Sequence, residues 1–377
     1  MRPVVPLALV GILAGAGLAS GWGCTASGVS EHVVMWRVPD GGRLPQAVVD
    51  DAGTVHLVYF QGEPNGGDLL YVTRTSSDVT WSEPQRVNSE PGTVAGADPI
   101  SGGRIALGRD NRLHVAWFKM GPTEFFYTRS TQQGTGFEAQ FGLAAGNGVE
   151  AGPTIAADGA GNVFLFWHAG ALEDAHRAVY MIMSHDDGTL FDPVRPVNAE
   201  AEGACNCCGL DALTDDAGAV YVSYRGAGDN IRRGQRLLVS RDEGRTFSDE
   251  LIQPWELGAC PVSTTALSQG PTGVKVTWET EGQVYFADVD HLEARVSPSE
   301  IAETRRKNPA VAVNDQGATL LVWGDGPGWR SGGALHWQVF GADGQTIEEH
   351  AAGTETIPDA SRPAALARAD GMFLVIF

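Results

Sequence analysis

Apolar and polar positions alternate along this chain in a repeating unit. Each unit has an apolar run, a tight polar turn such as Asp50 to Gly53, and a second apolar run that ends in an aromatic residue. Short apolar runs on either side of such turns predict antiparallel hairpins. The segments with this form are 45–60, 103–118, 153–167, 210–224, 265–278, 309–323 and 363–377.

The spacing of these seven hairpins predicts the fold. They recur about every 44 to 58 residues, which is the length of a four-stranded propeller blade. A single hairpin cannot bury its apolar faces alone, whereas blades packed around an axis bury both sides. We therefore predict an all-β protein, a β-propeller of four-stranded blades over residues 33–377, with seven blades. Six blades with an extra C-terminal hairpin is the alternative. Val33 to Val38 should add an outer strand to the last blade and close the ring.

A second motif follows the predicted third strands. Residues 240–247 match every fixed position of the pattern Ser-x-Asp-x-Gly-x-Thr-Phe/Trp, the Asp box, and residues 184–191 form a copy without the Thr. The pattern resembles that of the sialidase-like propellers. In such a turn the Asp accepts backbone hydrogen bonds and the Gly takes a left-handed conformation, so we assign the motif to architecture. The residues concerned are Ser184, Asp186, Gly188, Ser240, Asp242, Gly244, Thr246 and Phe247.

The resemblance to sialidases implies a carboxylate-binding site on the face where the first strands begin. Arg43, within Arg-Leu-Pro, is similar to the Arg-Ile-Pro motif, whose Arg is one of three that clamp the substrate carboxylate. Arg306 and Arg362 stand before other repeats at comparable places. The alternative is that these arginines simply pair with local carboxylates. The sialidase nucleophile is a Tyr, and the late Tyr285 falls inside a predicted outer strand.

Cysteines gather at the starts of two neighbouring repeats. Cys205, Cys207 and Cys208 precede one predicted first strand, and Cys260 precedes the next. Because equivalent positions in adjacent blades should lie close together, we predict a cluster of up to four sulfurs. Three interpretations stay open: disulfides, for example from Cys260 to one of the other three; a soft-metal site, with Cu(I) as the metal and His168 as a further ligand; and a redox-active pair.

The net charge restricts the partners of the protein, and the N-terminal segment predicts its export. The formal net charge is −20 over 377 residues, which argues against nucleic-acid binding and against docking on anionic lipid. Residues 1–23 have a basic start, an apolar run and a small-residue end, as a signal peptide has. Cys24 resembles the lipidated cysteine of bacterial lipoproteins. We expect an exported protein that is periplasmic, outer-membrane-anchored or extracellular, with membrane contact only through a lipid on Cys24.

Together these patterns predict an exported, sialidase-like propeller that binds a carbohydrate or protein ligand without catalysis. Its ligand face carries the cysteine cluster, and copper is the candidate cofactor. The alternative is an exo-α-sialidase-type glycoside hydrolase that uses Arg43 with Arg306 and Arg362.

Overall fold

A computed structural model describes residues 1, 30–145, 150–170, 173–298, 304–328, 330–350 and 355–377. The chain divides into Met1–Glu31 and a compact unit, His32–Phe377, and the strands of the described residues belong to the second unit. The predicted signal peptide, beyond Met1, and the predicted lipidation site Cys24 lie outside the described residues.

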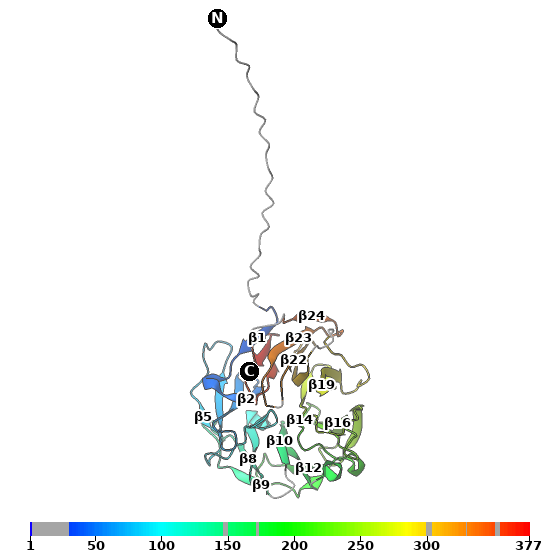
Figure 1. The fold of residues 1–377 in the computed structure, drawn as a ribbon. Helices are drawn as coiled ribbons and strands as arrows, with labels where there is room; N and C mark the ends of the chain where they lie inside the picture. The colour runs from blue at the N-terminus through cyan, green and yellow to red at the C-terminus, as the bar shows by residue number, and fades with distance from the viewer. Residues whose placement is uncertain (2–29, 146–149, 171–172, 299–303, 329, 351–354) are drawn as a thin grey trace. The chain divides into compact units, whose positions relative to one another are not determined.

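The strands of this unit form seven sheets, which are the blades of a propeller (Figure 1). Blade 1 contains β2 (Arg43–Val49), β3 (Val55–Gln61), β4 (Asp68–Arg74) and β5 (Gln85–Arg86). Blade 2 contains β6 (Arg104–Leu107), β7 (Leu113–Lys119), β8 (Glu124–Arg129) and β9 (Phe141–Ala145). Blade 3 contains β10 (Glu150–Ala157), β11 (Val163–Gly170), β12 (Arg177–Ser184) and β13 (Arg195–Pro196). Blade 4 contains β14 (Asp211–Thr214), β15 (Val220–Arg225), β16 (Gln235–Ser240) and β17 (Ser248–Gln253).

The remaining three blades differ in strand number. Blade 5 contains β18 (Thr265–Gly270), β19 (Gly273–Thr280) and β20 (Gln283–Asp288). Blade 6 contains β21 (Arg306–Val313), β22 (Thr319–Asp325), β23 (Ala334–Phe340) and β24 (Thr346–Glu349). Blade 7 contains β25 (Ala364–Ala367), β26 (Phe373–Ile376) and β1 (Val33–Trp36). Blades 5 and 7 thus have three strands within the described ranges. Short 3-10 turns are η1 (Pro39–Gly41), η2 (Arg109–Asn111), η3 (Asp174–His176) and η4 (Glu200–Glu202).

The first strands of successive blades surround the axis. They pack side by side in the order β2, β6, β10, β14, β18, β21 and β25, and β25 returns to β2. This closed order makes a ring of seven blades. The seven-blade prediction is therefore confirmed, and the alternative of six blades with an extra hairpin is wrong.

Both ends of the compact unit build the closing blade. β26 lies in the middle of the sheet, antiparallel to β25 and parallel to β1, with Val33 opposite Phe373 and Trp36 opposite Ile376. Val38 N also donates to Phe377 O at 3.0 Å. The predicted outer strand at Val33 is confirmed, and hydrogen bonds between distant parts of the chain hold the ring together.

The apolar core lies between neighbouring blades. Along β11, Leu165 and Trp167 pack toward blade 2, whereas Phe164 and Phe166 pack toward blade 4, because side chains alternate along a strand. Both faces of a second strand are therefore buried, which explains why these strands are almost continuously apolar. Each fully buried side chain of this size contributes about 1.5–3 kcal/mol relative to exposure.

The backbone bends sharply where several first strands begin. Leu44, Val262, Asn308 and Ala360 all have positive φ, between 50° and 57°. Such conformations cost on the order of 1–3 kcal/mol each for residues other than glycine, so the surrounding contacts must hold them. These bends recur at the entrances of blades 1, 5, 6 and 7. They set the course of the loops on this face, which we call the entrance face.

Candidate functional site

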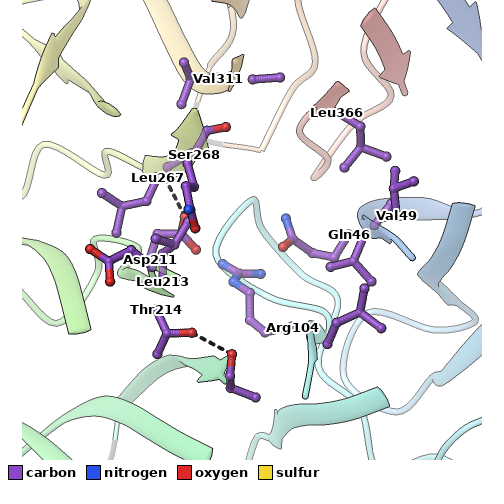
Figure 2. Close-up of a pocket in the computed structure, with 18 of the residues that line it drawn as sticks. Gln46, Val49, Arg104, Asp211, Leu213, Thr214, Leu267, Ser268, Val311 and Leu366 are labelled. Atoms are coloured by element: carbon purple, nitrogen blue, oxygen red, sulfur yellow. Dashed lines mark hydrogen bonds between the residues drawn. The ribbon is translucent and has the colours of Figure 1, made fainter. Parts of the chain in front are cut away.

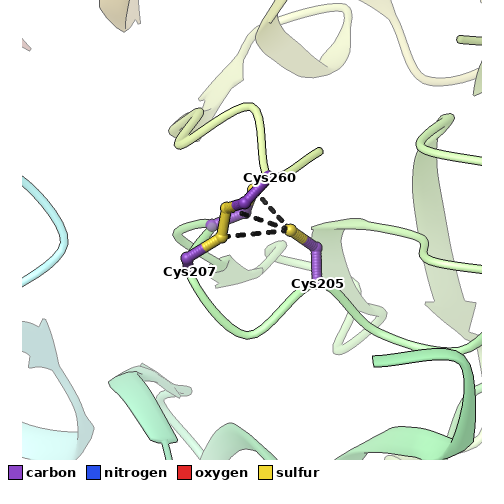
Figure 3. Close-up of side chains that lie close together, drawn as sticks. Cys205, Cys207 and Cys260 are labelled. Carbon is purple, nitrogen blue, oxygen red and sulfur yellow. Dashed lines mark hydrogen bonds between the residues drawn. A yellow bond between two sulfur atoms is a disulfide. The ribbon is translucent and has the colours of Figure 1, made fainter. Parts of the chain in front are cut away.

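Two loops on the entrance face bring four sulfur atoms together (Figure 3). Cys205, Cys207 and Cys208 lie between η4 and β14, and Cys260 lies between β17 and β18. All four Sγ atoms are within 4.8 Å of one another. Cys205 Sγ is 2.9 Å from Cys208 Sγ, 3.6 Å from Cys207 Sγ and 3.8 Å from Cys260 Sγ. The predicted cluster is present, built from the entrances of blades 4 and 5.

The four cysteines are in two chemical states. Cys207 and Cys260 form a disulfide that links the two blades, and both residues are half-buried. Cys205 and Cys208 are free thiols with no exposed surface. The disulfide is thus the part of the cluster that solvent reaches, and the pair Cys205/Cys208 is a buried dithiol.

Backbone hydrogen bonds hold the sulfur-bearing loop. Cys205 N donates to Arg225 O at 2.9 Å, and Cys208 N donates to Cys205 O at 3.2 Å, which forms a tight turn. Gly209 N donates to Ser263 O at 2.9 Å and so ties the loop to the entrance of blade 5. These bonds fix the sulfurs on ordered backbone from two sheets.

A buried guanidinium lies beside the dithiol. Arg225 has no exposed surface, and it donates to Ser263 Oγ at 3.1 Å, to Arg233 O at 2.8 Å and to Glu279 O, all of them uncharged acceptors. Ser263 Oγ in turn donates to Cys208 Sγ at 3.5 Å. A buried charge with neutral partners favours a nearby anion, and the thiol group is placed to supply one.

The two buried thiols have different acidities. Burial opposes ionisation of Cys208, but the hydrogen bond from Cys205 and the charge of Arg225 lower its pKa to about 7. Burial, together with the neighbouring Cys208, raises the pKa of Cys205 well above its ordinary value. Of the two sulfurs, Cys208 is therefore the one that ionises more readily, and the thiolate of the pair forms there first as pH rises.

His168, the predicted further ligand, is not in this group of sulfur atoms. It lies near the end of β11 opposite Val179 and is completely buried. Burial, with a contribution from the charge of Arg177, lowers the pKa of its imidazole to about 3, so the ring is neutral. Its place inside a sheet, in the core between blades, explains why the structure leaves it outside the cluster.

The loop between β5 and β6 crosses the axis at the entrance face. Arg362 of blade 7 donates to Pro99 O and, at 3.3 Å, to Ser101 O. Ile100 lies against Gly209, which directly precedes the first strand of blade 4. A methyl group added at Gly209 would lie 3.5 Å from Ile100 Cγ2. Blades 4 and 7 are on opposite sides of the ring, so the segment between Ala95 and Gly102 must span the axis. We call this segment the axial loop.

The other two predicted clamp arginines are held elsewhere. Arg43 Nη1 donates to Asp359 O at 3.2 Å, and its guanidinium lies over the ring of Phe60. Arg306 is buried, and its Nη1 donates to Gln283 Oε1 at 3.2 Å. Each of the three arginines, including the one under the axial loop, thus has its own local partners.

A cavity of about 1270 Å³ follows the axis (Figure 2). First strands of all seven blades line it, together with the turns between first and second strands. Arg104 extends into this space from the start of β6, and Asp211 faces it from the start of β14. Neither residue is among those that the sequence pattern singles out. Each occupies the first position of a first strand, which is the signal that would have placed them on the axis.

The end of the cavity near the axial loop holds two positive charges and one negative charge. Arg104, Arg362 and Asp211 all line it. Burial raises the pKa of Asp211 to about 6, although Leu267 N and the two arginines oppose the shift. Burial also lowers the pKa of Arg104 to about 10. Arg362 Nη2 is buried without a hydrogen-bond partner among the described residues.

The Asp-box turns are closed by their own side chains. Asp242 Oδ1 accepts from Thr246 N at 2.9 Å and from Ser240 Oγ at 2.8 Å, while Gly244 N donates to Ser240 Oγ at 2.8 Å. These bonds, led by that from Thr246 N, lower the pKa of Asp242 to about 2. Gly244 has φ +78°, and Phe247 packs with the blade 3 and 4 core. The polar side chains of the motif thus have structural partners.

The second copy follows the same plan. Asp186 Oδ1 accepts from Leu190 N at 2.8 Å, and Ser184 Oγ accepts from Gly188 N at 2.9 Å. Gly188 has φ +76°, and an added methyl group there would collide with Tyr127. Glycine is required at this turn for both reasons.

Comparison with known proteins identifies the fold. No protein-family pattern matches the chain, and no curated protein matches it. The α-L-arabinanase of Penicillium chrysogenum, solved with arabinobiose, has TM-score 0.54 and 14% identity, covering 81% of this chain and 95% of its own. A mutant α-L-arabinofuranosidase of Fusarium graminearum, solved with an iminosugar inhibitor, has TM-score 0.54 and 11% identity, covering 82% and 91%. The Hadza microbial sialidase Hz136 has TM-score 0.50 and 11% identity, covering 83% and 74%.

These likenesses concern the fold alone, because the sequence identities are low. The chain has the fold of a sialidase-like propeller, and the resemblance expected from the Asp boxes is confirmed at that level. No helix within the described ranges is long and apolar enough to cross a membrane.

Proposed function

We propose that this protein is an exported, non-catalytic binding protein built on a sialidase-like propeller. The observation that carries the proposal is the axial loop, which covers the axis on the entrance face. Arg362 holds that loop through two backbone carbonyls, so its guanidinium does not face an open carboxylate site on the entrance face. The exo-sialidase alternative needs the three arginines at one such site.

The position of the late tyrosine also supports a non-catalytic role. Tyr285 lies in β20, directly opposite Trp278 of β19, and the two rings stack with centroids 5.7 Å apart. Both residues belong to the core between blades 4 and 5. A nucleophile must instead reach a substrate carbon, as catalysis by covalent attack requires.

The ligand of this binding protein would occupy the axial cavity. Two guanidiniums face a single carboxylate at its covered end, and among the described residues Arg104 Nη1 has one hydrogen bond, a long one of 3.4 Å to Gly103 O. Planar guanidinium groups bind carboxylates well, particularly where water is excluded. A carboxylate on a carbohydrate therefore fits the covered end of the cavity, whereas Asp51, Asp110, Asp158, Asp215, Asp216 and Glu243 also line the cavity and oppose an acidic ligand there. The arabinanase with the same fold was solved with a carbohydrate, arabinobiose.

Calorimetry with N-acetylneuraminic acid tests the binding, and its methyl ester is the neutral control. We expect the acid to bind and the ester not to. Arg104→Gln should weaken binding about tenfold or more, the loss of one charged hydrogen bond. The matched control Arg245→Gln changes an exposed arginine of an Asp-box turn and should bind like the wild type.

A fluorogenic sialoside separates the two functions. No turnover is the expected result. Turnover that Arg43→Ala abolishes would show that the protein is a sialidase and would overturn the proposal.

A further inference from the structure

The cysteine cluster holds a dithiol and a disulfide at reacting distance. Cys205 Sγ is 3.6 Å from one sulfur of the Cys207–Cys260 disulfide and 3.8 Å from the other. These separations are van der Waals contacts. Because the two distances are nearly equal, Cys205 Sγ lies beside the S–S bond, and exchange requires a turn of the loop that brings the attacking sulfur in line with that bond. The dithiol itself has Cys-x-x-Cys spacing, since Cys205 and Cys208 flank two residues.

The surroundings favour an anionic sulfur. Arg225 is completely buried among uncharged acceptors, and Ser263, one of those acceptors, also donates to Cys208 Sγ. Cys205 Sγ lies 2.9 Å from Cys208 Sγ, so a proton can pass directly between the two. Transfer of this proton can therefore move the negative charge from Cys208 to Cys205, where it is the less populated form of the pair.

We propose that Cys205, Cys207, Cys208 and Cys260 form an internal thiol–disulfide relay, in which the buried dithiol passes two electrons to the half-buried disulfide. The dithiol formed from Cys207 and Cys260 then reacts with an external disulfide. This inference goes beyond carbohydrate binding and does not depend on which ligand the axial cavity takes.

The internal step balances without any external reagent. Cys205 gives its proton to the Cys208 thiolate and attacks one sulfur of the Cys207–Cys260 disulfide, which releases the other sulfur as a thiolate. That thiolate takes the proton from Cys208. Cys208 then attacks Cys205 Sγ and displaces the sulfur that Cys205 had bound. One disulfide breaks and one forms, so Cys205 and Cys208 are oxidised while Cys207 and Cys260 are reduced.

The external step uses the exposed side of the cluster. Gly258 and Ala259, directly before Cys260, are exposed, whereas the buried pair has no solvent contact. An external disulfide therefore meets Cys207 or Cys260 first. The two reduced sulfurs become a disulfide again, and the external disulfide leaves as two thiols. The substrate class is a disulfide, and the relay supplies a second pair of electrons behind the first.

Connectivity mapping tests the internal step. The full chain is reduced, brought to the two-electron-oxidised level with oxidised glutathione, quenched with N-ethylmaleimide and mapped by mass spectrometry. We expect two isomers, one linked Cys207–Cys260 and one linked Cys205–Cys208. Because the exchange is internal, the rate at which the two isomers interconvert should not change when total glutathione is varied at a constant oxidation level.

Cysteine variants test the order of events. Fully reduced wild type should reduce two equivalents of oxidised glutathione, and Cys205→Ser should reduce only one. In Cys260→Ser, oxidation of the remaining cysteines to a Cys205–Cys208 disulfide should slow about tenfold or more, because the accessible partner pair is lost. Cys24→Ser makes the same chemical change ahead of the propeller and should behave like the wild type.

Three results would overturn the relay. The first is a single connectivity at every oxidation level. The second is a protein isolated with both pairs closed that resists reduction while folded. The third is a metal bound stoichiometrically by four thiols after anaerobic purification, which would make the cluster a soft-metal site. Carbohydrate binding can be intact in all three cases, so failure of the relay and failure of the proposed function are distinguishable.

Discussion

Cys205 Sγ lies 3.8 Å from Cys260 Sγ although 55 residues separate them in the chain. The contact arises because both residues stand at the entrances of neighbouring blades, where the ring places equivalent positions side by side. The Cys207–Cys260 disulfide uses the same geometry to connect blades 4 and 5 covalently. The cluster is therefore part of both the chemistry and the stability of the ring.

Removal of that disulfide should destabilise the propeller. Cys260→Ala opens a covalent loop with a sequence separation of 53. In the chain-entropy account this lowers the free energy of unfolding by about 2–4 kcal/mol. Urea unfolding without reductant measures the change, and wild type with reductant should lose a similar amount. An unchanged unfolding midpoint in the variant would contradict the structural role of the link.

Removal of the buried guanidinium should make the dithiol less acidic. In the wild type, the ultraviolet absorbance of the thiolate should appear with a midpoint near the Cys208 pKa of about 7. Arg225→Gln keeps hydrogen-bond donors but loses the charge, so the midpoint should rise by about one pH unit. Arg245→Gln is the exposed control. If the midpoint stays unchanged in Arg225→Gln, the arginine does not stabilise the thiolate.

Acid should weaken the contact between blades 2 and 3 at Asp187. Burial opposes ionisation, but His114 and Arg112 lower the pKa of Asp187 to about 2, and Arg112 Nη1 lies 2.8 Å from its Oδ2. A folded-state pKa below the ordinary value of 3.8 means stability that is present above pH 4 and lost as pH falls toward 2.

Asp187→Asn should therefore lower the free energy of unfolding at neutral pH by on the order of 2 kcal/mol and flatten its decline in acid. Urea titrations at several pH values check this. Asp110→Asn alters a carboxylate that is 93% exposed and should leave the profile unchanged. Equal profiles for wild type and Asp187→Asn would refute the assignment.

Loss of the Arg362 side chain should loosen the axial loop. Arg362→Gln removes the hydrogen bonds to Pro99 O and Ser101 O. Hydrogen exchange in the segment between Ala95 and Gly102 should then speed up about 10- to 100-fold, as expected for one or two lost bonds. Arg43→Gln, on the same face, should leave this segment as protected as in wild type. Unchanged exchange in Arg362→Gln would show that other contacts fix the loop.

Repeating features of the sequence predicted the repeating features of the structure. The hairpin period gave the seven blades, and the equivalent positions of Cys205 and Cys260 gave the cluster. Which sulfurs pair is decided by details of the loop turns, and the number of strands in blade 5 by the course of residues 289–298. Neither leaves a periodic signal.

The features of the axis were missed for a related reason. The axial loop has no periodicity, and Ile100 is a single apolar residue whose partner, Gly209, lies in a distant blade. The prediction of an arginine clamp depended on the position of each arginine just before a predicted first strand. That position says nothing about which carbonyls lie above these arginines, so Arg362 could not be recognised as the support of the axial loop.

The parallel pairing of Val33 with Phe373 has a consequence for biosynthesis. Of the described strands, β26 comes last in the chain and occupies the centre of its sheet, whereas β1 comes first and lies at the edge. A nascent chain consequently leaves the flanks of blades 1 and 6 uncovered until β25 and β26 have left the ribosome, so closure of the ring cannot begin before β26 is made.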